Sequence, residues 1–168
     1  MTNAFEFFNL VPSLAVDAKL LRAKFLEIQR NSHPDFGSDG NTDSELANTY
    51  FEILKSPEKR IQVLLELYAN NSLNNNLLPA DFLMEMMELN DVIDNSKNGD
   101  EHATQQANSE LDHIKLELDN QMSEYFKQWD SGQITVSSDT DWSELTIWYQ
   151  KMKYWSRLRK NLDGINEI

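Results

Sequence analysis

The proline of the tripeptide His-Pro-Asp, at residues 33–35, constrains the fold of this chain more than any other single residue. Proline holds its own φ near about −65° and disfavours the helical conformation of the residue before it. A helix that runs towards this point must therefore end at or before His33. The imidazole of His33 and the carboxylate of Asp35 are thus expected on a loop that a helix supports.

A helix is predicted on the N-terminal side of this loop. The pattern starts near Ala15, and Asp17 falls in its first turn. Apolar residues at the i, i+4 and i+7 positions form one buried stripe. The members of this stripe are Leu21, Phe25 and Ile28. A shorter helical pattern precedes this helix, over residues 5–10, and is closed by Pro12.

The polar sides of the longer helix are basic. At about 100° per residue, three of its cations fall within one sector. These cations are Lys19, Arg22 and Arg30, whereas Lys24 lies outside the sector. A basic face is therefore expected to lead to the loop.

The helical pattern resumes after the polar segment that follows the tripeptide. Asp43 or Ser44 is predicted to cap this helix. Pro57 interrupts the pattern, and an apolar run then continues to Tyr68. The apolar positions ahead of Pro57 are Leu46, Ala47, Tyr50, Phe51 and Leu54.

The Asn-rich segment 69–78 has no periodicity and is the natural linker of the chain. We therefore expect two domains, residues 1–75 and 76–168. Their charges differ, because the first contains 7 basic and 10 acidic residues and the second contains 8 basic and 18 acidic ones. The second domain is expected to carry most of the acidity.

The second domain is predicted to contain three helices. Polar segments rich in Gly, Asn, Ser and Asp separate them, and the run at residues 133–136 is too short to predict a strand. The helices are expected at residues 79–95, 100–129 and 141–163. The predicted fold class is all-α in two parts.

Charge and composition exclude several classes of function. The chain has 15 Lys and Arg against 28 Asp and Glu, so a net charge of −13 repels nucleic acid and anionic lipid. The absence of cysteine excludes disulfides, thiolate metal sites and cysteine nucleophiles. His102 and His113 are about 16 Å apart on a helix, which is too far for shared metal ligation. Without cysteine ligands or a histidine pair, we expect no metal or cofactor. No basic leader or apolar span is present, so we expect a cytoplasmic protein.

The segment "QRNSHPD", at the end of a basic helix and followed by a second helix, resembles the J-domain family. In that family two antiparallel helices present the loop to a DnaK-type chaperone ATPase. The resemblance implies that His33, Pro34 and Asp35 stimulate ATP hydrolysis by an HscA- or DnaK-type partner. It also implies that Lys19, Arg22 and Arg30 supply the docking face.

The second half of the chain resembles the HscB-type iron-sulfur co-chaperones. Residues 79–94, "PADFLMEMMELNDVID", are similar to the family segment "FLMEQLELRE", and residues 56–68 are similar to the stretch that joins the two family domains. "KMKYWSRLRKNL" near the C-terminus extends the resemblance over nearly the full length. The family fold is an L-shaped pair of a J-domain and a C-terminal three-helix bundle. The chain departs from the pattern at Phe36, Ile61, Asn90 and Asn95.

Periodicity gives the methionine-rich helix an inward face and leaves its other apolar residues open to two interpretations. Phe82, Met86, Leu89 and Ile93 form the inward face. Additional apolar residues spread onto adjacent faces, where core filling and partner binding are about equally compatible with the pattern. The resemblance favours binding of an IscU-type iron-sulfur scaffold. The residues it implies are Leu83, Met84, Met87, Glu88, Asp91 and Tyr154, with Trp155 expected in the core.

The sequence therefore predicts a co-chaperone in iron-sulfur cluster assembly that is not itself an enzyme. A catalytic pair of His33 and Asp35 is disfavoured, because a rigid proline separates them and no nucleophile motif accompanies them. A general J-domain protein for other clients is one alternative, although the Gly/Phe-rich linker and the Cys-rich repeats expected of one are absent. A helical adaptor in which the tripeptide is accidental, with His33 an ordinary loop histidine, is the other.

Overall fold

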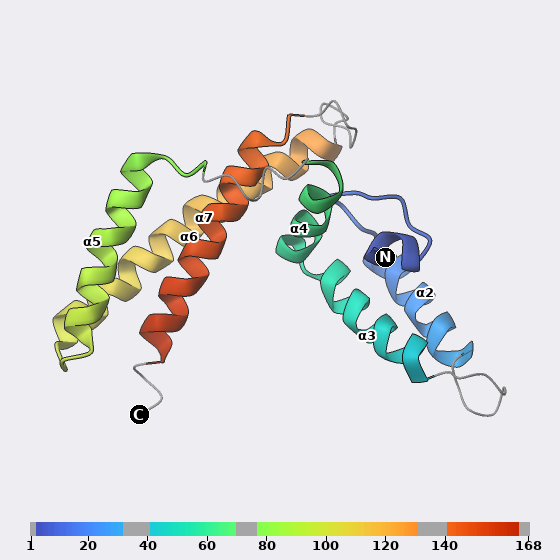
Figure 1. The fold of residues 1–168 in the computed structure, drawn as a ribbon, viewed down its shortest axis with the longest axis horizontal. Helices are drawn as coiled ribbons and strands as arrows, with labels where there is room; N and C mark the ends of the chain where they lie inside the picture. Colours follow the sequence, from blue (N-terminus) through green and yellow to red (C-terminus); the bar gives the residue numbers. More distant parts are fainter. Residues whose placement is uncertain (1–2, 32–40, 70–76, 131–140, 165–168) are drawn as a thin grey trace. The chain divides into compact units, whose positions relative to one another are not determined.

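The computed structural model of the chain describes residues 3–31, 41–69, 77–130 and 141–164. Every regular element within these ranges is a helix, so the predicted all-α class is confirmed (Figure 1). The tripeptide at residues 33–35, the predicted domain boundary at 75 and 76, and the short run at 133–136 lie outside the described residues.

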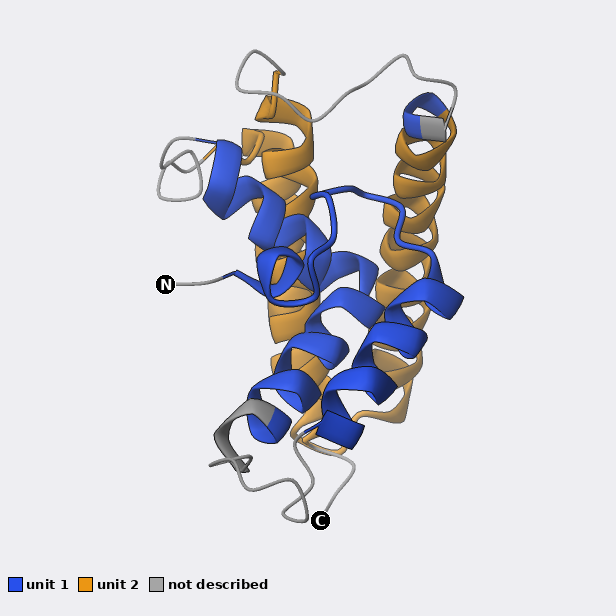
Figure 2. Cartoon of the chain, turned by 90° about the vertical axis from the view of Figure 1, so that its right-hand side faces the viewer, with its two compact units in different colours: residues 1–70, 128–140 blue, residues 71–127, 141–168 orange. Residues whose placement is uncertain are grey.

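Two compact units make up the chain (Figure 2). Unit 1 comprises residues 1–70 with 128–140, and unit 2 comprises residues 71–127 with 141–168. Among the described residues, four helices belong to unit 1: α1 (Ala4–Phe7), α2 (Ala18–Asn31), α3 (Asn41–Lys55) and α4 (Pro57–Tyr68). Three helices build unit 2: α5 (Ala80–Ser96), α6 (Glu101–Asp130) and α7 (Ser143–Asp163), with the last residues of α6 counted in unit 1.

Asparagine and aspartate side chains start the first two helices. Asn3 accepts hydrogen bonds from the backbone of Phe5 (2.9 Å) and Glu6 (3.1 Å), and the Glu6 carboxylate accepts one from the Asn3 backbone in return. Asp17 Oδ1 accepts from the backbone N–H of Lys19 at 2.8 Å. The prediction that α2 begins near Ala15 was wrong, because Asp17 caps the helix from outside its first turn.

The start of α3 also differs from the prediction. The helix begins at Asn41, so positions 43 and 44 lie within its first turn and not at the predicted cap position. The Ser44 hydroxyl instead donates to Oε1 of Gln29 at 2.8 Å, and Gln29 Nε2 donates to the Ser44 carbonyl at 3.3 Å. The predicted cap therefore joins α3 to the last turns of α2.

A buried arginine joins three segments of unit 1. The Arg60 side chain is only 8% exposed, and its Nε donates to the Leu14 carbonyl at 3.0 Å. Its Nη1 donates to the carbonyls of Leu54 and Lys55, which are left without intrahelical partners at the end of α3. Burial lowers the pKa of this guanidinium. Around it lies the apolar core of Phe5, Phe8, Leu14, Leu21, Ala47, Leu54, Ile61, Leu64 and Leu65.

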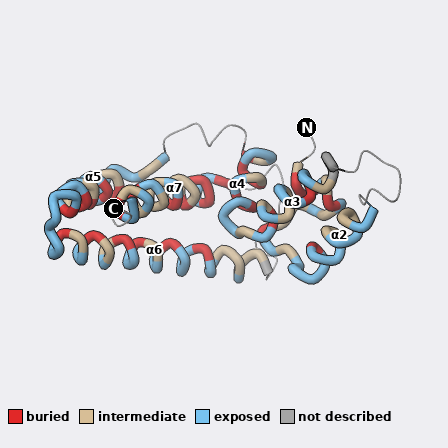
Figure 3. Tube along the Cα trace, turned by 90° about the horizontal axis from the view of Figure 1, so that it is seen from below, coloured by how far each residue is buried: buried red, intermediate tan, exposed pale blue. Residues whose placement is uncertain are grey.

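Unit 2 contains the three helices that the sequence predicts at 79–95, 100–129 and 141–163, each displaced by no more than two residues. Buried residues recur every three or four positions along α6, which Figure 3 shows as one buried side and one exposed side. They are Ala103, Ala107, Leu111, Ile114, Leu118 and Met122. Trp148 and Trp155 of α7 donate their indole N–H groups to the carbonyls of Leu118 and Leu111, each at 2.8 Å.

Candidate partner-binding surfaces

The predicted docking cations lie along α2. The side chains of Lys19, Arg22 and Arg30 are exposed, and that of Lys24 is half-buried. Lys19 and Arg30 are eleven residues apart, so about 16 Å of helix separates them. The Nε of Arg30 donates to the Leu26 carbonyl at 3.2 Å, which turns this guanidinium back along its own helix. The structure thus gives a row of exposed cations, and the three do not form a single cluster.

Hydrogen bonds between side chains hold the ends of α2 and α3 together beside the undescribed segment 32–40. In addition to its bonds with Ser44, Gln29 Nε2 donates to Asn48 Oδ1 at 3.3 Å. Deeper in the unit, the rings of Phe25 and Phe51 lie 4.5 Å apart, centroid to centroid. Polar contacts near the ends and aromatic packing further down therefore fix the pairing of the two helices. Sequence reasoning missed the part played by Gln29.

The inward face of α5 agrees with the prediction. Phe82 is 7% exposed, and Met86, Leu89 and Ile93 are at most 1% exposed. Met84 and Met87, in contrast, are 64% and 66% exposed. Core filling therefore does not account for these two methionines.

The predicted scaffold-binding residues of α5 wrap around the helix. At about 100° per residue, Leu83 and Met87 share the flank next to the inward face. Met84 and Asp91 follow on the side that points away from the core, and Glu88 lies beyond them. Leu83 is half-buried, and both Glu88 and Asp91 are exposed. Leu83, Met84 and Met87 form what we call the apolar edge of α5. The carboxylates of Glu88 and Asp91 border this edge.

Tyr154 of α7 lies beside the inward face of α5. Its ring is 6.3 Å from that of Phe82, at an interplanar angle of 84°. The guanidinium carbon of Arg157 is 4.1 Å from the centre of the Tyr154 ring. Trp155, which was expected in the core, is half-buried and bonds to α6 on another side of α7. The structure therefore brings Tyr154 close to the methionine helix and adds Arg157, which sequence reasoning missed.

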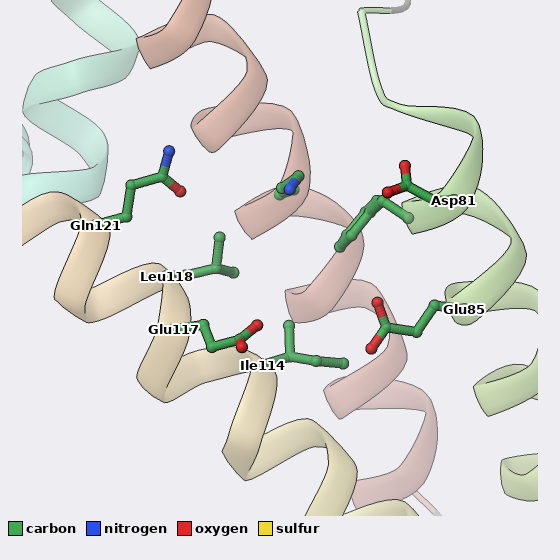
Figure 4. Close-up of a pocket in the computed structure, with 8 residues that line it drawn as sticks. Asp81, Glu85, Ile114, Glu117, Leu118 and Gln121 are labelled. Atoms are coloured by element: carbon green, nitrogen blue, oxygen red, sulfur yellow. The ribbon is translucent and has the colours of Figure 1, made fainter.

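A hollow of about 190 Å³ opens between α5 and α6, with α7 behind it (Figure 4). The carboxylates of Asp81, Glu85 and Glu117 lie around it, and the Lys151 ammonium is 4.9 Å from the centre of the Phe82 ring. Within the described ranges, no group of three or more His, Cys, Asp or Glu residues is arranged to hold a metal ion. This hollow has the composition of a solvated polar groove.

None of the helices in the described part of the chain has the length and apolar character needed to cross a membrane.

Known proteins resemble this chain over nearly its full length. The HSCB C-terminal oligomerisation domain family matches residues 78–163. The "Co-chaperone protein HscB homolog" of Vibrio vulnificus strain YJ016 is 26% identical over 175 residues, which cover 98% of this chain and 97% of that protein.

Two solved structures share the fold of the chain. The chaperone HscB from Vibrio cholerae superposes with a TM-score of 0.63 at 20% identity, and the match covers 98% of each chain. Human co-chaperone protein HscB gives a TM-score of 0.65 at 23% identity, over 96% of this chain and 80% of that one. Because the matched parts include both units, the likeness extends beyond the C-terminal helices.

Proposed function

This chain belongs to the HscB family of co-chaperones, and on that premise we propose that it acts in iron-sulfur cluster assembly. Through residues 33–35 it stimulates ATP hydrolysis by an HscA- or DnaK-type chaperone, and through α5 and α7 it binds an IscU-type scaffold and delivers it to that chaperone. We propose that the protein carries out this role in the cytoplasm. The protein breaks no bond itself, because the hydrolysed nucleotide belongs to its partner.

The position of the tripeptide supports the chaperone half of this proposal. In the sequence, His33, Pro34 and Asp35 follow one residue after the end of α2, whose row of exposed cations is suited to an acidic groove. Such charges act mainly by steering the encounter with a partner. Pro34 restricts the backbone before binding, which reduces the entropy lost when His33 and Asp35 are ordered. A carboxylate at position 35 is able to accept a charge-assisted hydrogen bond from an arginine of the ATPase.

The exposure of Met84 and Met87 is the observation that carries the scaffold half. The inward face of α5 is filled by other residues, and most of the surface of these two side chains is left exposed. Two adjacent exposed methionines make an adaptable apolar surface of the kind that protein partners cover. Tyr154 of α7 adds an aromatic ring that contacts Phe82 of the same helix as the methionines.

Single-turnover ATP hydrolysis by the DnaK-type chaperone tests the first half. We expect the wild-type protein to accelerate hydrolysis and His33→Gln to abolish the acceleration. The melting temperature of the variant should stay unchanged, since loop-surface substitutions usually alter stability by no more than about 0.5 kcal/mol. Equal acceleration by both proteins would contradict the J-domain role.

Titration with purified apo-scaffold from the same organism tests the second half. The double variant Leu83→Ala/Met87→Ala should keep the wild-type melting temperature within a few degrees and lose at least about tenfold in affinity, as buried interface anchors commonly do. A protein that stimulates the ATPase but binds no scaffold would be a general J-domain co-chaperone. One that does neither would be a helical adaptor.

A further inference from the structure

Within unit 2, positive charge is concentrated on α7, in a chain that is acidic overall. The chain has a net charge of −13, yet the 21 residues of α7 contain five cations and only two carboxylates. The five cations are Lys151, Lys153, Arg157, Arg159 and Lys160. The contacts of each cation separate those that pair within unit 2 from those that stay exposed.

Two of the five cations are engaged within unit 2. Arg159 donates to Asn108 Oδ1 at 3.0 Å and lies 3.6 Å from a carboxylate oxygen of Asp112. Lys151 is half-buried, with its ammonium over the Phe82 ring. Both cations therefore serve packing between helices.

The other three cations form a ridge on the solvent side of α7. Lys153, Arg157 and Lys160 are all exposed, and their spacing of four and then three residues places them in one row on the helix surface. Among the described residues, no carboxylate lies within ion-pair distance of any of them. We call these three residues the α7 basic ridge.

Aromatic rings of the same helix hold two members of the ridge. Arg157 lies over Tyr154 at 4.1 Å, and the Lys153 ammonium is 5.8 Å from the centre of the Tyr149 ring. A guanidinium stacked on a ring keeps its in-plane N–H donors available to a carboxylate. Because stacking also restricts its rotamers, less entropy remains to be lost on binding. Arg157 is thus a cation positioned for an anionic group of a partner.

We propose that the α7 basic ridge binds an acidic segment of the iron-sulfur scaffold, with Arg157 receiving a carboxylate. This inference rests on the proposed function, since Arg157 stacks on Tyr154, whose ring contacts Phe82 of the proposed scaffold-binding helix α5. Glu88 and Asp91 border the apolar edge of α5 on the side that faces away from the core. A partner that covers this surface therefore needs an acidic group for α7 and a basic group for α5, and this polarity fixes its orientation.

The overall charge favours a protein over nucleic acid as the occupant of the ridge. A polyanion attracted to three cations must approach a chain with 28 acidic residues, nine of them on α5 and α6 in the same unit within residues 81–117. A folded scaffold with one local acidic segment avoids this repulsion. Nucleic acid remains an outcome that the experiment detects.

The test is calorimetric titration of the full-length protein with purified apo-scaffold, at low and high salt. We expect Arg157→Gln to weaken binding by about tenfold at low salt, with a smaller loss at high salt, as for a close interfacial charge pair. Arg157→Lys keeps the charge without the planar guanidinium, so its affinity should lie between those of wild type and Arg157→Gln. The matched control is Lys127→Gln, which removes an exposed cation of α6 and should bind within about twofold of wild type.

The outcomes separate this inference from the proposed function. Loss of affinity in Leu83→Ala/Met87→Ala with none in Arg157→Gln overturns the inference and leaves the proposed function in place. No scaffold binding by the wild-type protein overturns the inference together with the scaffold half of the proposed function. Retention of a single-stranded 20-mer DNA by wild type but not by Arg157→Gln assigns the ridge to nucleic acid and also overturns the inference. Unchanged melting of Arg157→Gln establishes that a loss of affinity is due to the missing guanidinium.

Discussion

Arg60 in unit 1 and Arg157 in unit 2 show two uses of the same side chain. Arg60 is buried, and backbone carbonyls from two separate segments surround its guanidinium. Arg157 is exposed and stacks on an aromatic ring of its own helix. The first cation is satisfied by the protein itself, and the second is left with donors for another molecule. The partners of a cation, and not its residue type, therefore distinguish a structural role from a binding role.

The largest expected effect comes from removing the buried member of this pair. Arg60→Met leaves the carbonyls of Leu14 and Leu54 buried without their donor, so we expect a loss of about 3–5 kcal/mol in the free energy of unfolding. Urea denaturation followed by circular dichroism measures the change. Arg157→Met is the matched control, with an expected loss below about 0.5 kcal/mol. Equal losses in the two variants would show that burial does not distinguish them.

Met86 and Met87 of α5 show the same contrast between a buried and an exposed side chain, here without charge. Met86 is fully buried and Met87 is 66% exposed. Met86→Ala should cost about 3 kcal/mol of stability, because a cavity opens in the core of unit 2. Met87→Ala should cost less than about 0.5 kcal/mol, and its effect should appear in scaffold affinity. A stability loss of similar size in both variants would place Met87 in the core.

The polar contacts between α2 and α3 should have a smaller effect on stability. Ser44→Ala removes the hydroxyl that donates to Gln29, which should cost about 1 kcal/mol. Glu45→Ala, one residue further along α3 and exposed, is the control. We expect faster amide exchange at the ends of both helices in Ser44→Ala, measured by mass spectrometry. Exchange that matches the control would mean that aromatic packing alone pairs the helices.

The smallest effect is expected at Asp141, just ahead of α7. Its carboxylate accepts a hydrogen bond from the Ser143 backbone at 2.9 Å, and this bond lowers the pKa of Asp141 below its usual value. A lowered folded-state pKa gives stability above the pKa of the unfolded chain, and that stability is lost as the pH falls through the folded value. Asp141→Asn should therefore reduce the difference in melting temperature between pH 7 and pH 3. An unchanged difference would contradict this linkage.

Periodicity and the positions of proline and glycine were sufficient to predict much of the fold. The inward face of α5 followed from apolar spacing, and the limits of the unit 2 helices followed from their flanking turn residues. Helix starts in unit 1 were less predictable, because Asp17 and Ser44 are equally good caps in isolation. Only the structure shows that Ser44 bonds to Gln29 on another helix.

The candidate binding surface was only partly predictable from the sequence. Apolar spacing alone does not distinguish an exposed Met87 from a buried one, and the ring contact between Phe82 and Tyr154 joins residues on different helices. Arg157 did leave a signal, since it follows Tyr154 by three residues on a helix with an excess of cations. That signal becomes specific only when the contacts of the other four cations are known.

The two indole bonds of α7 have a consequence for the axial register of unit 2. The donors Trp148 and Trp155 are seven residues apart, and so are their acceptors, Leu118 and Leu111, which follow in the opposite chain direction. Two antiparallel helices satisfy both bonds at one register alone, and a slip of even one residue, about 1.5 Å, breaks both together. The two tryptophans therefore fix the axial position of α7 relative to α6. They also set the level at which Tyr154 and Arg157 stand beside α5.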